Sequence, residues 1–242
     1  MKVLILGGSA EARALAGRLH PAHDVVSSLA GRVPDPALPV GEVRIGGFGG
    51  TEPMRRWLVE NGVAAVVDAT HPFATAITQR TADVCGDLGL PHIVLARPQW
   101  DPGDAITVDS AAEAAEAVEK QRHSRVFLTS GRSTIGAFKR STAWYLVRVV
   151  IAPPTDALPA SHTLLTSRGP YRYEGELALM REHRIHVLVT KNSGGEYTRA
   201  KLDAAATLYI PVIMINRPPL PDGVTTVGTV DDAADWVSGY DG

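Results

Sequence analysis

Two stretches of this chain repeat one another about 120 residues apart, and the repeat limits the folds that the chain can adopt. Residues 91–98 (PHIVLARP) are echoed by residues 211–218 (PVIMINRP), and Thr70-His71 is echoed at the same offset by Thr190-Lys191. Residues 107–113 (TVDSAAE) resemble residues 229–235 (TVDDAAD) at an offset of 122. Each reads as a strand leading into a helix capped by Asp or Ser. The repeat predicts two similar α/β halves that enclose a ligand cleft.

Short β-branched runs alternate with amphipathic stretches along both halves. This alternation predicts mainly parallel sheets with helices on both faces, in two Rossmann-like α/β/α domains at 1–100 and 101–242. Exchange of the terminal strands between the halves is an open alternative. An eightfold βα barrel would need a shorter and more regular repeat. Strands are expected near 2–6, 24–29, 42–45, 64–68, 92–96, 125–128, 145–150, 186–189 and 211–215, and helices near 9–20, 52–61, 73–88, 110–120, 171–184, 196–208 and 230–239.

The composition excludes several classes of protein. Apolar residues make up 45% of the 242 residues, which is enough for a packed core. No apolar run approaches the roughly 18 residues of a membrane span, and the N-terminus turns polar too early for a signal peptide. Cys85 is the only cysteine, so neither an internal disulfide nor a thiolate metal cluster is possible. These features predict a soluble cytoplasmic protein without a membrane partner.

The charge distribution argues against nucleic acid as a partner. The net charge is −2, and no clustered basic stripe is present. Residues 121–242 nevertheless carry 14 basic against 11 acidic side chains. A mildly positive half suits an anionic small molecule, although ordinary surface scatter would give the same balance.

A glycine turn follows the first expected strand and opens a helix. It is not a complete G-x-G-x-x-G pattern, because a serine stands at the second glycine position and an alanine at the third. The backbone N–H groups of such a turn, together with the helix dipole, form an anion site. A plain strand-to-helix turn without a ligand is the alternative. The residues predicted to hold a dinucleotide here are Gly7, Gly8, Ser9, Ala10 and Glu11.

The second expected strand lacks the acidic residue with which NAD-preferring folds hold the ribose diol. Ser27 and Ser28 stand there instead, followed by Arg32. Two hydroxyls and a guanidinium suit a ribose phosphate, so NADPH is favoured over NADH as cofactor. Arg32 could equally be a solvated loop arginine. The glycine-rich segment 46–50 that follows either allows the backbone to approach a ligand closely or serves as a flexible connector.

Thr70 and His71 follow the strand at 64–68, at the strand edge where open α/β sheets bind ligands. We predict that Thr70 contacts the cofactor and that His71 is the catalytic proton donor. Local capping or packing by His71 is the alternative.

Polar, basic segments follow the expected strands of the second half as well. If they converge on one cleft, they form a site for several carboxylates or phosphates, in which arginine adds forked hydrogen bonds. Taken singly, each cation reads as a surface charge. The predicted substrate-binding residues are Arg132, Arg168, Lys191, Ser193 and Lys201. No nucleophile elbow, metal-ligand spacing or phosphate loop occurs, so neither a hydrolase nor a metal site is predicted.

These segments together resemble the precorrin-6A reductases of aerobic cobalamin biosynthesis. The matching segments are residues 5–13, 68–74, 129–132, 168–171, 189–195 and 210–218, in the expected order over nearly the whole chain. Some relatives have Thr where this chain has Ser9. The resemblance implies NADPH-dependent reduction of one double bond of a precorrin macrocycle, giving precorrin-6B. The acetate and propionate groups of that macrocycle fit the basic segments.

The resemblance implies that the main role of the protein is to position the cofactor against the macrocycle. The conjugated macrocycle is already a good hydride acceptor, so the protein must bring the nicotinamide and the ring carbon to roughly 3–3.5 Å. A non-catalytic dinucleotide or anion sensor, or a reductase of another small anionic substrate, would use the same features. The sequence defines no oligomeric state.

Overall fold

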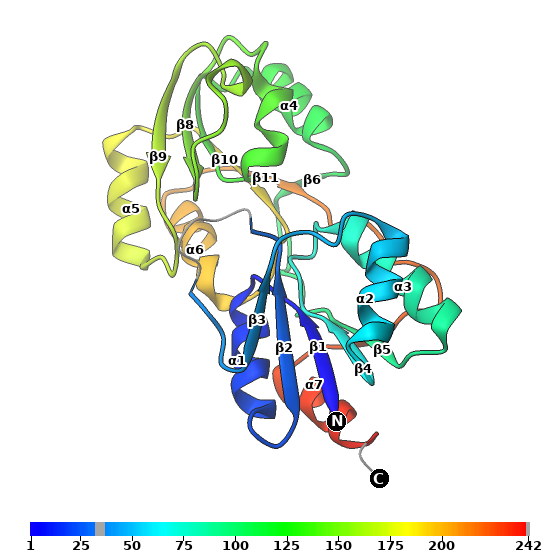
Figure 1. Ribbon diagram of the computed structural model, residues 1–242. Helices are drawn as coiled ribbons and strands as arrows, with labels where there is room; N and C mark the ends of the chain where they lie inside the picture. Colours follow the sequence, from blue (N-terminus) through cyan, green and yellow to red (C-terminus); the bar gives the residue numbers. More distant parts are fainter. Residues whose placement is uncertain (32–36, 241–242) are drawn as a thin grey trace. The chain divides into compact units, whose positions relative to one another are not determined.

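Each half of the repeat contributes to two separate α/β units. The structure is a computed structural model that describes residues 1–31 and 37–240. One unit comprises Met1–Pro98 with the chain from Pro218 onward, and the other comprises Gln99–Arg217 (Figure 1). Arg32, predicted to bind the cofactor, lies outside the described residues.

The first unit is built on a six-stranded sheet in which every pairing is parallel. The strand order is β12-β5-β4-β1-β2-β3. With β12 in the sixth position, this order is that of a dinucleotide-binding fold, in which ligands bind at the carboxyl ends of the strands. The strands are β1 (Lys2–Leu6), β2 (Asp24–Leu29), β3 (Glu42–Ile45), β4 (Ala65–Asp68), β5 (His92–Leu95) and β12 (Thr225–Val227).

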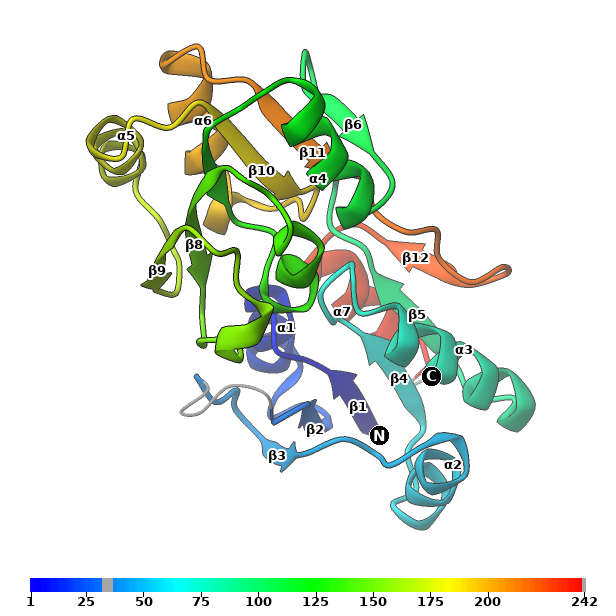
Figure 2. The same ribbon diagram turned by 90° about the horizontal axis from the view of Figure 1, so that it is seen from above.

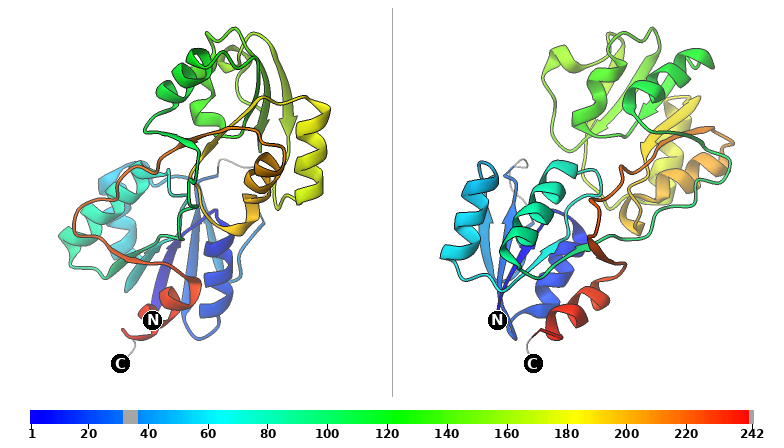
Figure 3. Two further views of the ribbon diagram at one scale, coloured as in Figure 1. Left: turned by 180° about the vertical axis from the view of Figure 1, so that it is seen from behind. Right: turned by 90° about the vertical axis from the view of Figure 1, so that its right-hand side faces the viewer.

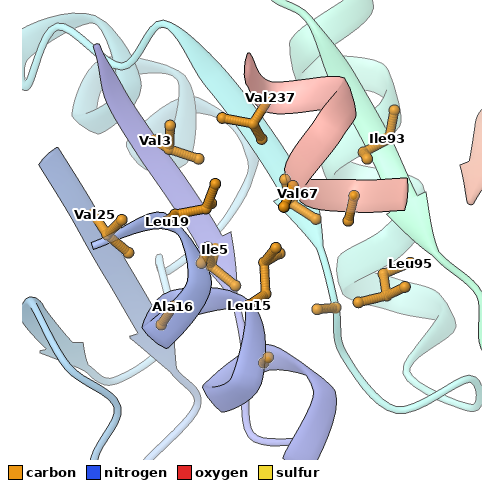
Figure 4. Close-up of a cluster of buried hydrophobic side chains, with 14 residues drawn as sticks. Val3, Ile5, Leu15, Ala16, Leu19, Val25, Val67, Ile93, Leu95 and Val237 are labelled. Carbon is orange, nitrogen blue, oxygen red and sulfur yellow. The ribbon is translucent and has the colours of Figure 1, made fainter. Parts of the chain in front are cut away.

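Helices cover both faces of this sheet because alternate strand residues point to opposite sides. Val3 and Ile5 of β1 pack with α1 (Ala10–Leu19) and α7 (Val230–Ser238), as Figure 4 shows. Leu4 and Leu6 face the other way, toward α2 (Thr51–Glu60) and α3 (Thr75–Leu88). The left panel of Figure 3 shows α2 and α3 on one side of the strands and α1 on the other.

The second unit has a parallel sheet of the same design, in the order β6-β11-β10-β7-β8-β9. Leu146 faces α5 and α6, whereas Tyr145 faces the 3-10 helix η1 through Phe138. The strands are β6 (Ile106–Val108), β7 (Arg125–Leu128), β8 (Trp144–Val149), β9 (His162–Thr166), β10 (Val187–Lys191) and β11 (Val212–Ile215). The α-helices are α4 (Ala111–Lys120), α5 (Tyr173–Glu182) and α6 (Ala200–Thr207), and the 3-10 helices are η1 (Arg132–Phe138), η2 (Thr155–Ala157) and η3 (Glu196–Thr198).

Each sheet takes its outer strand from the other half of the repeat. After β5 the chain enters the second sheet, where Ile106 of β6 pairs with Ile213 of β11. After β11 it returns to the first sheet, where Thr225 of β12 pairs with Ile93 of β5 (Figure 2). The predicted domain at 101–242 is therefore corrected, because the chain from Pro218 onward belongs to the first unit.

The structure also corrects the alignment of the final repeated segments. The side chains that cap α4 and α7 are Ser110 and Thr229, each accepting a backbone N–H three residues on. These caps are 119 residues apart rather than 122. In the second segment the cap is thus a threonine, not an aspartate. Among the described residues, no helix is both long and apolar enough to cross a membrane.

Candidate cofactor and substrate sites

The loops after four strands of the first sheet are joined at one edge by backbone hydrogen bonds. The Gly7 N–H donates to the Ser28 carbonyl at 2.9 Å, and the Gly46 N–H donates to the Leu29 carbonyl at 2.8 Å. After β4, the Ala69 N–H donates to the carbonyl of Leu6, the last residue of β1. The glycine turn, the end of β2, the glycine-rich segment and the loop carrying Thr70 therefore share one edge of this unit.

The glycine turn has the geometry of a phosphate site. Gly8 has φ +111°, a conformation that L side chains rarely adopt. A Cβ on Gly7 would lie 3.4 Å from the Ala12 Cβ, so turn and helix approach closely. The Ser9 hydroxyl accepts the Ala12 N–H at 3.0 Å and donates to the Ala69 carbonyl at 2.7 Å. The remaining first-turn N–H groups of α1 are available to an anion, which fits a dinucleotide pyrophosphate.

The two serines of β2 point to opposite faces of the sheet. The Ser28 hydroxyl accepts a hydrogen bond from Nη1 of Arg44 at 3.1 Å. Ser27 is buried, and no described residue bonds its hydroxyl. The end of β2 carries no carboxylate, as the sequence predicted.

Arg44, on β3, is a candidate that the sequence reasoning did not find. It pairs directly with Ser28 in the parallel ladder, and its guanidinium lies 3.8 Å from the Phe48 ring centroid. It also donates to the Gly46 and Gly47 carbonyls. Burial lowers its pKa, although an arginine stays protonated in a protein. Only the register between β2 and β3 shows that Arg44 lies next to Ser28, and the sequence does not reveal this register.

The acidic groups near this edge have partners within the unit. Glu11, predicted to contact the cofactor, pairs with Arg97 at 2.8 Å. Asp68 is buried and accepts hydrogen bonds from the Thr70 N–H, the Thr70 hydroxyl and the Thr78 hydroxyl. Asp68 thus fixes the loop that carries Thr70.

His71 is exposed, one residue beyond Thr70. Its Nδ1 accepts the Phe73 N–H at 3.3 Å, which fixes the ring locally. The neighbouring strand β5 begins with His92, whose pKa burial lowers while the Asp68 charge opposes that shift. Of the two histidines, His71 is exposed and His92 is half-buried.

Three of the predicted cations follow strand ends of the second sheet. Arg132 follows β7, Arg168 follows β9 and Lys191 ends β10. These strands are parallel, so the three residues lie at the same edge. Arg132 and Arg168 are exposed, whereas Lys191 is half-buried and its pKa is lowered by burial. The Ser193 N–H bonds the Lys191 carbonyl and turns the backbone there.

Lys201 occupies a different environment from these cations. It is 4% exposed, donates to the Thr198 carbonyl at 2.6 Å and lies 4.5 Å from the Trp100 ring centroid. Its pKa is lowered to about 7, chiefly by burial and also by the charge of Arg148, while the charge of Glu176 opposes the shift. Lys201 therefore belongs to a buried charge cluster with the Arg148–Glu176 ion pair.

Comparison with known proteins identifies the family of the chain. The family model described as precorrin-6x reductase CbiJ/CobK matches residues 2–238. The chain belongs to this family. The resemblance found in the sequence is thereby confirmed.

Individual relatives support the assignment to the precorrin-6x reductase CbiJ/CobK family. The chain is 64% identical over 238 residues to a precorrin-6A reductase of Mycobacterium tuberculosis, covering 98% of each chain. It is 53% identical over 241 residues to a precorrin-6A reductase of Rhodococcus erythropolis, covering 98% of this chain and 97% of that protein. A solved structure of CobK precorrin-6A reductase matches with a TM-score of 0.92 and 33% identity, over 99% of this chain and 97% of that one. This match confirms the predicted α/β fold class.

Proposed function

We propose that this chain reduces precorrin-6A to precorrin-6B in cobalamin biosynthesis, with NADPH as the hydride donor. The observation that carries the proposal is the match to precorrin-6A reductases over almost the full length of the chain. As a member of a reductase family, the protein is an oxidoreductase that draws on a reduced nicotinamide cofactor. The choice of NADPH and the roles of individual residues rest on the geometry of the two sheet edges.

One feature of the first unit suits a dinucleotide in general, and a second favours NADPH over NADH. The turn at Gly7, Gly8 and Ser9 offers free N–H groups at the start of α1, as a pyrophosphate requires. The end of β2 presents Ser28 beside the Arg44 guanidinium, where an NADH site would carry a carboxylate. The sequence adds Arg32 as a second cation for the ribose phosphate. When bound, NADPH supplies the hydride that reduces the macrocycle.

The second unit supplies the groups that suit an anionic tetrapyrrole. Arg132 and Arg168 are exposed at the carboxyl edge of the sheet, where their guanidinium groups can form paired hydrogen bonds to acetate and propionate groups. Lys191 and the backbone around Ser193 extend this edge at β10. We assign these residues to orienting the macrocycle, the step on which hydride transfer depends.

We assign the proton that accompanies the hydride to His71. Its side chain is exposed and its Nδ1 accepts the Phe73 N–H, which in the neutral ring leaves the proton on the other nitrogen. His71→Gln keeps a polar side chain but removes the titrating group. Turnover of precorrin-6A is expected to fall about 10²-fold or more, with the Kd for NADPH unchanged. Turnover by His71→Gln at the rate of the unaltered protein would remove His71 from this role.

The proposed activity is tested by anaerobic turnover of precorrin-6A with purified protein. Loss of one conjugated double bond shifts the absorption of the chromophore, and the shift is expected to consume one NADPH per macrocycle. Binding of both ligands without a shift favours a sensor. Consumption of NADPH with other anionic substrates, but not with the precorrin, favours a reductase of another pathway.

A further inference from the structure

We propose that Arg44 and Ser28 form the seat of the 2′-phosphate of NADPH and thereby determine the preference of this protein for NADPH over NADH. The inference rests on the proposed use of a nicotinamide dinucleotide. It adds the specificity residues, of which Arg44 lies on a strand that the sequence did not associate with the cofactor.

The position of the pair follows from the sheet. In a fold with the strand order of the first sheet, the adenosine ribose lies at the carboxyl end of the strand next to the glycine turn, which is β2. Ser28 is at that end, and its carbonyl accepts the Gly7 N–H. Arg44 lies opposite Ser28 in the ladder and reaches its hydroxyl at 3.1 Å. The guanidinium therefore lies where a 2′-substituent of the ribose is expected.

The guanidinium is held in one orientation yet keeps donors for a ligand. Nη1 donates to the Ser28 hydroxyl and the Gly46 carbonyl, and Nη2 donates once, to the Gly47 carbonyl. The Nε–H group and one of the two N–H groups of Nη2 donate to no acceptor in the described part of the chain. These two N–H groups are left to donate to a ligand, and phosphate oxygens are suitable acceptors for them.

The surroundings make this cation suited to an anion. The Phe48 ring lies under one face of the guanidinium at 3.8 Å, which fixes its plane. Arg44 is half-buried, and no hydrogen bond or ion pair found in the described part of the chain joins it to a carboxylate. A phosphate would therefore meet a cation that is only partly hydrated and has already lost its rotamer freedom.

A purely structural role makes a different prediction. Through its bonds to Gly46 and Gly47, Arg44 also braces the segment between β3 and α2. If bracing were its only role, its loss would weaken every adenine dinucleotide alike. A phosphate seat instead makes the loss depend on the 2′-phosphate.

The test is a calorimetric titration of the full-length protein and its Arg44→Gln variant with NADPH, NADH, 2′,5′-ADP and 5′-ADP. Loss of charge-assisted bonds is expected to weaken NADPH and 2′,5′-ADP about tenfold to a hundredfold. The affinities for NADH and 5′-ADP are expected to stay within about twofold. Ser28→Ala should give a smaller loss in the same direction. Arg56→Gln, an exposed arginine of α2, is the matched control and should leave all four affinities unchanged.

Several outcomes overturn the inference. Equal weakening of all four ligands makes Arg44 a brace, and circular dichroism then shows whether the fold is altered. If Arg44→Gln discriminates between NADPH and NADH as the unaltered protein does, the 2′-phosphate binds elsewhere. The Arg32→Ala variant then shows whether Arg32, which the sequence predicts to bind the cofactor, holds this phosphate. If the unaltered protein binds NADPH no better than NADH, the proposed cofactor fails as well. A preference for NADPH that survives Arg44→Gln defeats this inference alone.

Discussion

The two units share one sheet topology but carry different chemistry at the same edge. After β1 the chain turns at Gly7 and Gly8 into the ten-residue helix α1, capped by Ser9. At the corresponding place after β7, Gly131 leads into the 3-10 helix η1, which has no side-chain cap. In a 3-10 helix each hydrogen bond joins residues three apart rather than four apart, and its geometry is poorer than in an α-helix. This difference supports our proposal that the pyrophosphate binds at the edge of the first sheet rather than at that of the second.

The strand beside the centre of each sheet shows the same contrast. In the first unit, β2 ends in Ser28, which meets the half-buried Arg44. In the second unit, β8 carries Arg148, which forms a buried ion pair with Glu176 of α5 and stacks on Tyr171. The first cation has no carboxylate partner among the described residues, whereas the second is paired with a buried carboxylate. The comparison teaches that topology sets where a ligand binds and that a few side chains at the strand ends set which ligand it is.

The largest effect is expected from breaking the buried ion pair of the second unit. Glu176→Ala leaves Arg148 buried without its partner, 5% exposed at the side chain and close to the Lys201 charge. The free energy of unfolding of this unit should fall by about 3–5 kcal/mol. Chemical denaturation followed by tryptophan fluorescence measures it, with Trp144 and Trp100 as reporters in this unit.

The matched control is an exposed pair in the same unit. Arg199 and Asp203 of α6 are about half exposed, and Asp203→Asn should cost at most about 0.5 kcal/mol. If Glu176→Ala and Asp203→Asn lower the free energy of unfolding by similar amounts, the buried ion pair is no more important for stability than an exposed one.

Lys201 gives the second unit a pH dependence of stability. Burial lowers its pKa from 10.5 to about 7 in the folded state, so between these values the unfolded chain binds the proton more readily. The stability of the unit should therefore rise from pH 7 to pH 9, and the destabilisation is fully present below pH 7. Lys201→Met should flatten this rise in denaturation midpoints, while the exposed Lys139→Met should preserve it. If the denaturation midpoint of Lys201→Met rises with pH as steeply as that of the unaltered protein, other groups cause the pH dependence.

The smallest effects separate capping from cofactor binding. Ser9 and Ser110 cap α1 and α4 in the same way, each accepting the N–H three residues on. Either serine-to-alanine change should cost about 1 kcal/mol of stability. Only Ser9→Ala should also weaken NADPH, as measured by fluorescence titration. If Ser110→Ala weakens NADPH equally, the difference between the two edges does not lie in the cofactor.

The regular elements were predictable from the sequence because buried parallel strands leave continuous apolar runs, as at β1 and β11. The edge strand β9 (His162–Thr166) escaped prediction, because its two leucines are flanked by polar residues and do not form a longer apolar run. The exchange of β6 and β12 depends on contacts far apart in the chain, and local patterns do not encode it. The domain division therefore came out differently from the simple halving of the repeat.

Residues near a glycine turn or a strand end were also within reach of the sequence. Ser9 was identified as a cap and a phosphate contact, and the cap is present. Arg44 was missed because its role depends on the register that sets it opposite Ser28. Lys201 read as one more basic group of the substrate edge, whereas its helix buries it against Trp100. Periodicity does not reveal which face of a short helix the other elements cover.

The proposed activity requires that the first unit binds a phosphorylated nicotinamide dinucleotide. Isothermal titration of the unliganded protein with NADPH, and separately with NADH, tests this most directly. One site per chain with at least tenfold tighter binding of NADPH is the predicted result. Absence of heat with NADPH, or equal affinity for the two nucleotides, would contradict it.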